Sequence, residues 1–413
     1  MMRPRRVFFF NRFFWPDQSA TAQILTDLCR ELDVLGYEVT VISSRLDYAN
    51  KEIQYDRREQ LGGVEIVRLW STRFGRGTLS GRLMDYLTIY YSFFAYILRN
   101  LGGGDIVVLK TDPPLLSILG SIGRLVKQFR LVAWCQDVFP EVAIASMRPS
   151  NFTSWLFKFL KLVRDWSLRR SDRVVVLGKD MQAYLSAREI ERHRLVCISN
   201  WAVQEDEGGT REKELRAAWE IPEDVLLVGY SGNLGRAHDW KTLLESAKAL
   251  EKEDKIHFLL CGGGHGYAAL QEAVEDAGLE SSFTFLPYQP LDELASALRV
   301  PDVHWFTLKE AMTPYIFPSK FFGILQAGRP VIFIGDTRCE IAELLAFAEA
   351  GCSIHEGDYS SLVEALRRYS RNPDLLGKEG SNARRLWAEN YQRSNEVARW
   401  DRMLQELDNI QGG

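Results

Sequence analysis

The chain of 413 residues is too long for one compact domain, so its length favours two. Its composition, with 46% hydrophobic and 26% charged residues, is that of a globular protein and excludes a mainly disordered or fibrous state. The net charge of −4 conceals a division, because residues 1–200 carry 29 Lys and Arg against 20 Asp and Glu, whereas residues 201–413 carry 22 against 35. A basic half joined to an acidic half suggests that the two halves meet different partners.

The N-terminus and the cysteines indicate a protein that stays in the cytoplasm. Arg3, Arg5 and Arg6 run directly into an apolar segment without a small-residue cleavage site, which argues against a signal peptide. The six cysteines form no C-x-x-C pair, so scattered thiols in a reducing compartment explain them better than disulfides or a zinc site. The longest apolar run, residues 86–98, is shorter than the ~20 residues that cross a bilayer.

The first half of the chain alternates short apolar strands with helices. We expect strands at residues 7–11, 37–42, 105–109, 130–134 and 173–177. Between the first two strands, Ser19 caps a helix with apolar residues at helical spacing, and Gly36 ends it. Strands that alternate with helices are typical of parallel β-α-β units, so this half is predicted to form a doubly wound sheet.

The same alternation restarts after residues 204–209, a polar segment with two glycines that reads as the interdomain linker. Strands are expected at residues 225–230, 256–260, 283–286, 303–306 and 330–334, and helices at 241–250, 267–277 and about 381–407. We therefore predict an α/β fold of two Rossmann-like domains that face a cleft. Ligands of such sheets bind at the carboxyl ends of the strands.

Two glycine-rich segments of the second half have the composition of phosphate-binding loops. The first contains Gly232, Asn233, Gly235 and Arg236, and the second is residues 261–266, with glycine at positions 262, 263, 264 and 266. Each lies between a strand and a helix, where glycine lets the backbone approach a phosphate and the helix start offers free N–H groups. A tight turn without a ligand is the alternative, and neither segment matches G-x-G-x-x-G.

A third segment places a lysine at a helix start. Pro318 and Ser319 suit the beginning of a helix, so Lys320 falls in its first turn, where the helix dipole disfavours a cation. A lysine there makes sense if it reaches an anion bound at that helix end, although a surface lysine is the alternative. The histidines show no metal-ligand spacing, so we expect chemistry without a metal, with Arg236, His238 and Lys320 as the available donors to a leaving phosphate.

These segments resemble those of the retaining family 4 glycosyltransferases, which have the two-domain GT-B fold, and especially the branch that builds bacterial surface polysaccharides. Residues 318–332 resemble the donor-site segment of that family, residues 231–235 and 260–264 resemble its diphosphate loops, and residues 136–141 resemble a segment at the cleft end of a first-domain strand. The resemblance covers nearly the whole chain. It implies an acceptor domain at 1–203, a nucleotide-sugar domain at 210–391, and a C-terminal helix, about 392–413, that packs back on the first domain.

The donor site departs from the family pattern. The two glutamates of the family's E-x7-E motif fall on Tyr315 and Gly323, so both are absent. Glu310 is a candidate to replace the glutamate that ordinarily holds the ribose. The basic pair of the family's first diphosphate loop falls on Asn233 and His238. Tyr288, Glu310, Pro318, Ser319 and Lys320 complete the expected donor-binding set with the glycine loops, including Gly262, Gly263 and Gly264.

The family often places a histidine near the reacting sugar, where this chain has only Asp137 and Glu141. The resemblance makes these two, with Lys320, the catalytic candidates. The alternative is structural: Asp137 caps a turn and Glu141 is an exposed helix start. We place Asp17, Gln18 and Ser19 on the acceptor side.

The reaction that the resemblance implies is transfer of a hexosyl or N-acetylhexosaminyl group from a nucleoside-diphosphate sugar, with UDP as the expected nucleotide and Tyr288 stacked on uracil. The anomeric configuration is retained, no metal or other cofactor takes part, and the acceptor is lipid-linked or a polysaccharide. Unlike a retaining glycosidase, the sequence offers no evident pair of carboxylates for a covalent intermediate. Catalysis would rest on positioning and on stabilising the departing diphosphate.

Residues 155–170 form a basic amphipathic pattern. Trp155, Leu156, Phe159, Leu160, Leu162, Val163 and Trp166 share one side of a helical wheel, and Lys158, Lys161, Asp165 and Arg169 share the other. This pattern favours binding at a membrane surface, although a helix that packs on the sheet is an equal alternative. Together with the basic charge of the first half, this pattern predicts a peripheral protein at the cytoplasmic face of the membrane. Nucleic-acid binding is disfavoured, because the sequence contains no basic-aromatic binding module.

Two other functions remain open. A UDP-sugar 2-epimerase shares the fold and would turn over a nucleotide sugar without an acceptor. A non-catalytic GT-B partner subunit would explain the absent glutamates and would bind a nucleotide without releasing sugar.

Overall fold

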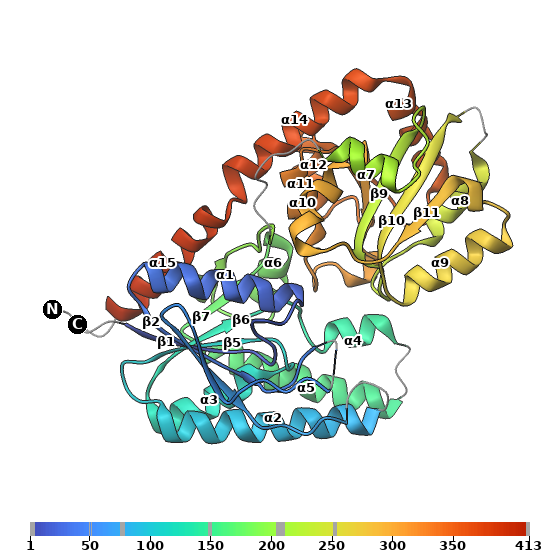
Figure 1. The fold of residues 1–413 in the computed structure, drawn as a ribbon. Coiled ribbons are helices and arrows are strands. Elements are labelled where there is room, and N and C mark those ends of the chain that lie inside the picture. The colour runs from blue at the N-terminus through green and yellow to red at the C-terminus, as the bar shows by residue number, and fades with distance from the viewer. Residues whose placement is uncertain are drawn as a thin grey trace. The chain divides into compact units, whose positions relative to one another are not determined.

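The computed structural model describes residues 5–48, 50, 52–74, 79–147, 151–203, 211–250 and 254–409, which form two compact units (Figure 1). Unit 1 comprises Met1–Ser199, Tyr315–Phe317 and Ser394–Gly413, and unit 2 comprises Asn200–Pro314 and Pro318–Arg393. The expected linker at residues 204–209 lies outside the described residues. A three-residue segment from the second half of the chain thus groups with the first unit, which the sequence did not indicate.

Unit 1 is built on an eight-stranded sheet in the order β3-β4-β2-β1-β5-β6-β7-β8. Its strands are β1 (Arg6–Phe10), β2 (Glu38–Ser44), β3 (Arg58–Leu61), β4 (Val64–Leu69), β5 (Ile106–Lys110), β6 (Arg130–Trp134), β7 (Arg173–Val176) and β8 (Leu195–Cys197). All neighbouring strands are parallel except β3 and β4. The hairpin of β3 and β4 was missed in the sequence because β3 is half polar and lies at the edge of the sheet.

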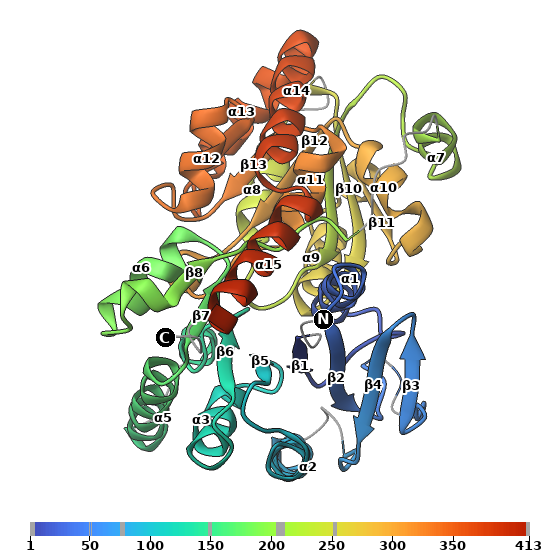
Figure 2. The ribbon, with the colours of Figure 1, turned by 90° about the vertical axis from the view of Figure 1, so that its left-hand side faces the viewer.

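The helices of unit 1 form two layers. They are α1 (Ala20–Val34), α2 (Leu79–Asn100), α3 (Leu116–Lys127), α4 (Glu141–Ser146), α5 (Asn151–Arg169), α6 (Lys179–Ala187), a short helix (Arg192–Arg194) and α15 (Arg393–Asn409). Figures 1 and 2 show α2, α3 and α5 side by side on one face of the sheet and α1 on the other. Trp400 of α15 packs on Trp134 of β6, with ring centroids 4.6 Å apart, so the final helix is anchored in the core of unit 1.

Unit 2 has a six-stranded sheet, entirely parallel, in the order β11-β10-β9-β12-β13-β14. The strands are β9 (Leu226–Asn233), β10 (Ile256–Gly263), β11 (Phe283–Leu286), β12 (Val303–Thr307), β13 (Val331–Ile334) and β14 (Gly351–Ile354). The helices are α7 (Glu212–Ala218), α8 (Lys241–Ala249), α9 (His265–Asp276), α10 (Leu291–Arg299), α11 (Lys320–Ala327), α12 (Glu340–Ala348), α13 (Tyr359–Arg371), α14 (Pro373–Asn390) and the short η3 (Glu280–Ser282) and η4 (Glu310–Met312). The predicted class, two doubly wound parallel-sheet α/β domains, is confirmed.

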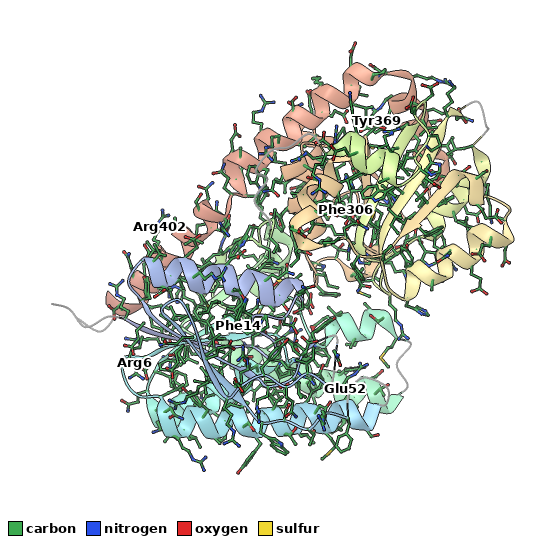
Figure 3. All side chains as sticks on the ribbon, in the orientation of Figure 1. Arg6, Phe14, Glu52, Phe306, Tyr369 and Arg402 are labelled. Atoms are coloured by element: carbon green, nitrogen blue, oxygen red, sulfur yellow. The ribbon has the colours of Figure 1, made fainter. Side chains whose placement is uncertain are left out.

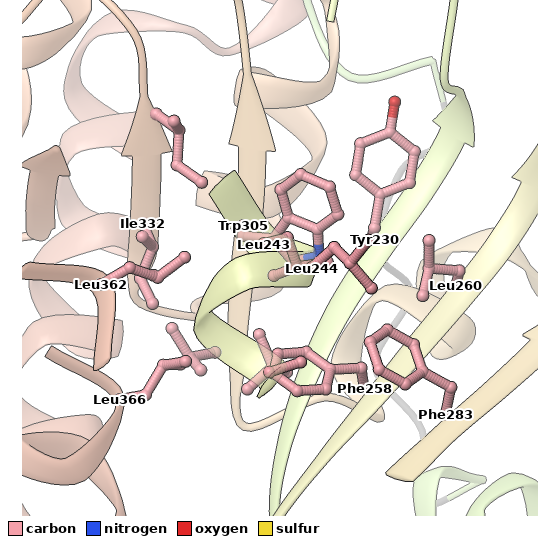
Figure 4. Close-up of a cluster of buried hydrophobic side chains, with 14 of the residues drawn as sticks. Tyr230, Leu243, Leu244, Phe258, Leu260, Phe283, Trp305, Ile332, Leu362 and Leu366 are labelled. Atoms are coloured by element: carbon pink, nitrogen blue, oxygen red, sulfur yellow. The ribbon is translucent and has the colours of Figure 1, made fainter. Parts of the chain in front are cut away.

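Apolar side chains fill the space between the sheet and the helices in each unit (Figure 3). In unit 2 the aromatic rings of Tyr230 and Trp305 meet at 4.8 Å, and those of Phe258 and Phe283 stack at the same distance (Figure 4). Tyr230 has a second function, because its hydroxyl points out of this core toward the end of β9. The core therefore fixes the strand end that forms part of the candidate site.

The last stretch, predicted to be helical at about 381–407, is helical but not one continuous helix. The structure has α14 and α15 instead, separated at Tyr391 and Gln392. The Tyr391 ring is buried 5.2 Å from that of Phe322 and 6.0 Å from that of Phe321 in α11, which fixes the chain at the point where α14 ends. The apolar periodicity continues through this break, so the sequence pattern could not reveal it.

Candidate functional site

The glycine-rich segments of unit 2 are strand ends rather than free loops. β9 and β10 continue to Asn233 and Gly263, and Gly232 pairs in register with Gly262. A Cβ atom on Gly262 would lie 2.1 Å from the Gly232 carbonyl oxygen, and the φ angles of the two residues are +147° and +120°. Only glycine tolerates this approach and this conformation. The close pairing of β9 and β10 therefore requires glycine at these two positions, whether or not a ligand binds there.

Beyond the strands, the two chains stay joined at the start of α9. Leu234 donates its backbone N–H to the Gly263 carbonyl at 2.8 Å and accepts one from Gly266 at 2.7 Å. Gly264 precedes α9 at φ +113°, where a Cβ atom would lie 2.2 Å from Oδ1 of Asn233. The Asn233 side chain therefore lies against the N-terminus of α9. Gly235 and the exposed Arg236 follow in the loop.

Lys320 is the first residue of α11 and reaches the end of β9. Its Nζ lies 3.1 Å from the Asn233 carbonyl oxygen and 5.2 Å from the centroid of the Tyr230 ring, and the Tyr230 hydroxyl donates to the same carbonyl at 2.9 Å. The Lys320 stem lies beside Gly232, where a Cβ atom would come within 2.9 Å of Cε. Pro318 is buried and Ser319 caps α11 without a side-chain hydrogen bond. The helix start and both strand ends thus converge on one ammonium group.

The charges at this site differ from the sequence expectation. Burial lowers the pKa of Lys320 to about 8, so the amine is mostly charged at neutral pH. Burial, followed by the charge of Lys320, lowers the pKa of His238 to about 3. Nδ1 of the neutral His238 donates to the Thr307 carbonyl oxygen, 2.5 Å away, which leaves Nε2 only as an acceptor. The neutral His238 therefore offers no second N–H, and its role as a donor to a phosphate stays a prediction.

Tyr288 and Glu310 lie on either side of these strand ends along the carboxyl edge of the sheet. Tyr288 follows β11 and is 60% exposed. Its ring lies against Gly263, because a Cβ atom added to this glycine would be 3.1 Å from Cε2 of Tyr288. Glu310 follows β12 in η4, with its carboxylate 3.0 Å from Nδ1 of His355. His355 in turn contacts the Thr337 hydroxyl at 2.9 Å. Glu310 is therefore held by an exposed imidazole, a partner that the sequence did not indicate.

In unit 1, Asp137 is exposed in the loop after β6, where its backbone bridges to Ile316. The pKa of Asp137 is raised to about 6, first because the surrounding protein removes water from its carboxyl group and second because of the negative charge of Asp112. Asp137 borders a cavity of about 20 Å³, which also touches Lys110. This cavity has room for about one water molecule.

Lys110, fully buried at the end of β5, was missed in the sequence because it ends an otherwise apolar strand. Its Nζ donates to the Thr21 carbonyl at 2.8 Å and lies 4.0 Å from the ring centroid of Trp134. Burial lowers the pKa of Lys110 to about 7. A charged residue at the carboxyl end of an apolar strand is the signal that could have identified it.

Glu141 begins α4, as the structural alternative expects, but it is buried rather than exposed. Its carboxylate accepts two hydrogen bonds from Arg164, at 2.9 and 3.2 Å, and one from the Tyr184 hydroxyl at 2.5 Å. Lys161 lies 3.6 Å away. Arg164 and these hydrogen bonds outweigh the effect of burial and lower the pKa of Glu141. A carboxylate held in this way positions the loop that carries Asp137 and is poorly suited to proton transfer.

The three residues expected on the acceptor side have different environments. Both carboxylate oxygens of the buried Asp17 accept backbone N–H groups, from Ser19 at 2.8 Å and Tyr48 at 2.6 Å. Asp17 therefore shapes its loop, and its role on the acceptor side stays a prediction. Ser19 is the N-cap residue of α1, but its side chain makes no capping bond, contrary to the prediction. Gln18 is exposed.

No group of three or more His, Cys, Asp or Glu among the described residues is placed to hold a metal ion. Within the same described ranges, no helix is both long enough and apolar enough to cross a bilayer.

Two doubly wound parallel sheets, one with a lysine-bearing helix start beside paired glycine strand ends, define a two-domain α/β protein of the GT-B class. Residues 19–201 match the Glycosyl transferase 4-like domain, and residues 211–386 match the Glycosyl transferases group 1 domain. "Probable glycosyltransferase WbjE" of Pseudomonas aeruginosa is 30% identical over 301 residues, which span 71% of this chain and 73% of that protein. The chain belongs to the GT-B family 4 glycosyltransferases.

Solved structures share the fold at low sequence identity. The Anabaena protein Alr3699/HepE, solved in complex with UDP and with UDP-glucose, superposes with a TM-score of 0.71 at 13% identity, over 97% of this chain and 99–100% of that chain. WaaG, described as a glycosyltransferase involved in lipopolysaccharide biosynthesis, has a TM-score of 0.67 at 16% identity, over 98% of this chain and 100% of its own.

Proposed function

We propose that this glycosyltransferase moves a sugar from a UDP-sugar to a lipid-linked or polysaccharide acceptor, with retention of configuration and without a metal ion. The observation that carries the proposal is the convergence of Lys320 and the paired strand ends at Gly232 and Gly262. An ammonium group at a helix start offers charge-assisted hydrogen bonds to a diphosphate, and the glycines keep side chains away from it. The complexes of Alr3699/HepE with UDP and UDP-glucose support this choice of nucleotide.

The order of the strands suggests how the donor lies. Tyr288 follows β11 and Glu310 follows β12. These two strands are separated by three steps of the sheet, and since neighbouring strands lie about 4.8 Å apart, the distance between them is roughly 14 Å. The glycine strand ends and Lys320 lie between them. A nucleoside diphosphate laid along this edge would stack its base on Tyr288 and bring its phosphates to Lys320. Glu310 would then lie on the side of the sugar rather than on the side of the base. This position does not favour Glu310 as the ribose ligand, the role of the family's glutamate at the position of Gly323.

The chemistry would follow from the charges of the two units. The ammonium group of Lys320 stabilises the negative charge of the departing diphosphate, as a metal ion would otherwise do. Asp137 in unit 1, with its pKa raised to about 6, is ionised at neutral pH and can take the proton of an acceptor hydroxyl. Glu141 and Arg164 position the Asp137 loop.

The experiment that tests the function is a thermal-shift panel with UDP, GDP, ADP and their sugars, followed by an assay of sugar release with lipid acceptors. Stabilisation by UDP and UDP-sugars alone, with acceptor-dependent release of UDP, is the expected result. Binding of UDP without release of sugar in any acceptor mixture would favour the non-catalytic partner subunit, a candidate that the absent glutamates at Tyr315 and Gly323 support. Turnover of the sugar nucleotide without an acceptor would favour the 2-epimerase.

Replacing Tyr288 by alanine should weaken UDP binding by about 1–3 kcal/mol, the range for stacking of one base on an aromatic ring. The variant Tyr288→Phe keeps the ring and should bind UDP like the parent chain. Isothermal titration with UDP and with pyrophosphate separates the effects, because pyrophosphate lacks the base and its affinity should not change. Equal loss for both ligands would show that Tyr288 supports the strand ends instead.

The affinity for UDP should fall as the pH rises above about 8, because the pKa of free Lys320 is about 8 and the neutral amine loses its charge-assisted bond. Up to about pH 8.5 UDP itself keeps a constant charge, since its last phosphate pKa is near 6 and its uracil ring stays neutral. We expect the dissociation constant to rise by up to about tenfold per pH unit above pH 8. Lys320→Arg stays charged, so its affinity should be flat between about pH 7 and 8.5. A flat profile for the parent chain would contradict the role of the lysine charge.

A further inference from the structure

Helix α5 buries charged side chains and exposes apolar ones. Arg164 and Asp165 are 4% and 0% exposed, whereas Trp155, Phe159 and Leu162 are 65%, 51% and 62% exposed. A helix that covers a globular domain ordinarily has the opposite distribution. The placement of Asp165 on the solvent side of the helical wheel is therefore wrong. The charged pair is buried because Arg164 binds Glu141 and Asp165 binds Arg188, the residue after α6, at 2.6 Å.

The neighbouring helices continue the same surface. α2, α3 and α5 lie side by side on one face of the sheet of unit 1 (Figures 1 and 2). Together they expose eleven large apolar side chains, a set that we call the apolar face: Leu83, Met84, Leu87 and Tyr91 of α2, Ile122, Leu125 and Val126 of α3, and Trp155, Leu156, Phe159 and Leu162 of α5. Single exposed apolar residues need no explanation, but a set on three adjacent helices marks an interaction surface.

The exposed charges on this surface all have one sign. The acidic residues of the three helices are Asp85 and Asp165, and both are buried. The basic residues that reach the surface, fully or in part, are Arg82, Arg99, Arg124, Lys127, Lys158, Lys161 and Arg169. Among the described residues of α2, α3 and α5, every exposed formal charge is therefore positive. An apolar area among cations matches the acyl chains and anionic headgroups of a lipid surface.

We propose that the apolar face binds an anionic lipid bilayer. A second copy of the chain is the less suitable occupant, because two identical faces would bring cations against cations. The inference rests on the proposed function in one respect, since a lipid-linked acceptor is what gives membrane binding its purpose.

The connections of the sheet place this surface next to the acceptor side of unit 1. α2 leads into β5 and α5 leads into β7, so both helices begin at the carboxyl edge of the parallel sheet. Most of the exposed apolar residues of both helices lie in their first halves, with Tyr91 and Leu162 just past the middle, and Asp137 follows β6 at the same edge. Binding through these helix starts would bring the edge that carries Asp137 close to the headgroups.

The apolar contribution is tested by sedimentation of the full chain with vesicles of phosphatidylcholine alone or mixed with phosphatidylglycerol. The parent chain should bind the mixed vesicles and bind the neutral ones poorly. The triple variant Trp155→Ser/Phe159→Ser/Leu162→Ser should bind the mixed vesicles at least about tenfold more weakly. Val34→Ser on the opposite helix layer and Phe347→Ser in unit 2 change equally exposed apolar residues and should bind like the parent chain.

The electrostatic contribution needs basic residues outside the buried network, which excludes Lys161 because of its contact with Glu141. Lys127→Glu/Lys158→Glu should weaken binding to the mixed vesicles and reduce its salt dependence. Lys241→Glu on α8 of unit 2 is the matched control and should leave binding unchanged.

Several results would overturn the inference: no binding of the parent chain to mixed vesicles, equal binding by the triple variant, or a parent dimer that the triple variant converts to a monomer. The last would identify a second copy as the occupant. A thermal shift with UDP on the same samples separates this surface from the proposed function. If vesicle binding depends on Trp155, Phe159 and Leu162 but UDP gives no thermal shift, the result would support membrane binding by the apolar face and contradict the proposed donor. The reverse result would contradict the surface alone.

Discussion

The variant Lys320→Ala is expected to bind UDP more weakly than the parent chain by about 1.5–3 kcal/mol, the range for a hydrogen bond to a charged group. This corresponds to a dissociation constant roughly ten to a hundred times larger. The structure gives the Lys320 ammonium group one hydrogen bond, to the Asn233 carbonyl, so N–H groups remain to bind a diphosphate. The loss should appear equally with UDP and with pyrophosphate, because the lysine faces phosphate rather than base.

Two further variants separate the charge of Lys320 from its packing. Lys320→Met keeps an apolar stem of similar length beside Gly232 and Tyr230, so it should lose affinity for UDP while the free energy of unfolding changes little. Lys241→Ala removes an exposed lysine of the same unit and should leave the affinity unchanged. Unchanged UDP affinity in Lys320→Met would show that the amine only stabilises the Asn233 carbonyl. Titration calorimetry and urea unfolding supply the two readouts.

The sequence predicted the features of the donor unit that depend on local pattern. The alternation of strands and helices, the glycines at the ends of β9 and β10, and Lys320 at the start of α11 all appear in the structure as expected from their neighbours in the chain. The charge state of His238 was not predictable in this way. It depends on Thr307, which is distant in sequence, and on the proximity of Lys320.

The error in α5 has a physical cause: the helical wheel gives the period of a pattern but not the side that faces the core. Residues 155–170 were correctly read as an amphipathic helix, yet the apolar stripe of its first half points outward. The decisive contacts are Arg164 to Glu141 and Asp165 to Arg188, each between residues 23 positions apart. Buried ion pairs of this kind overrule periodicity, and no local signal announces them.

Removal of the Arg164 side chain should therefore have the largest effect on stability. Arg164→Leu leaves Glu141 without its bidentate partner and takes from Asp165 a hydrogen bond of 2.6 Å, while both carboxylates stay buried. Loss of one partner of a buried pair costs about 3–5 kcal/mol, so the free energy of unfolding should fall by that amount at neutral pH. Arg169→Leu removes an exposed arginine of the same helix and should change it by less than about 1 kcal/mol.

The pH dependence of this loss distinguishes an electrostatic cause from a packing defect. In the parent chain the pKa of Glu141 is lowered, so its ionisation stabilises the fold above the unfolded value of about 4.3, and this contribution is lost as the pH falls through the lower, folded value. In Arg164→Leu the buried Glu141 has lost its bidentate cation and keeps only Lys161 nearby, so its pKa rises, and protonation relieves the weakly paired charge. The difference in unfolding free energy between the two chains should therefore shrink from neutral pH toward about pH 4, measured by urea unfolding. A difference that stays constant with pH would assign the loss to packing, because a cavity left by the arginine stem does not titrate.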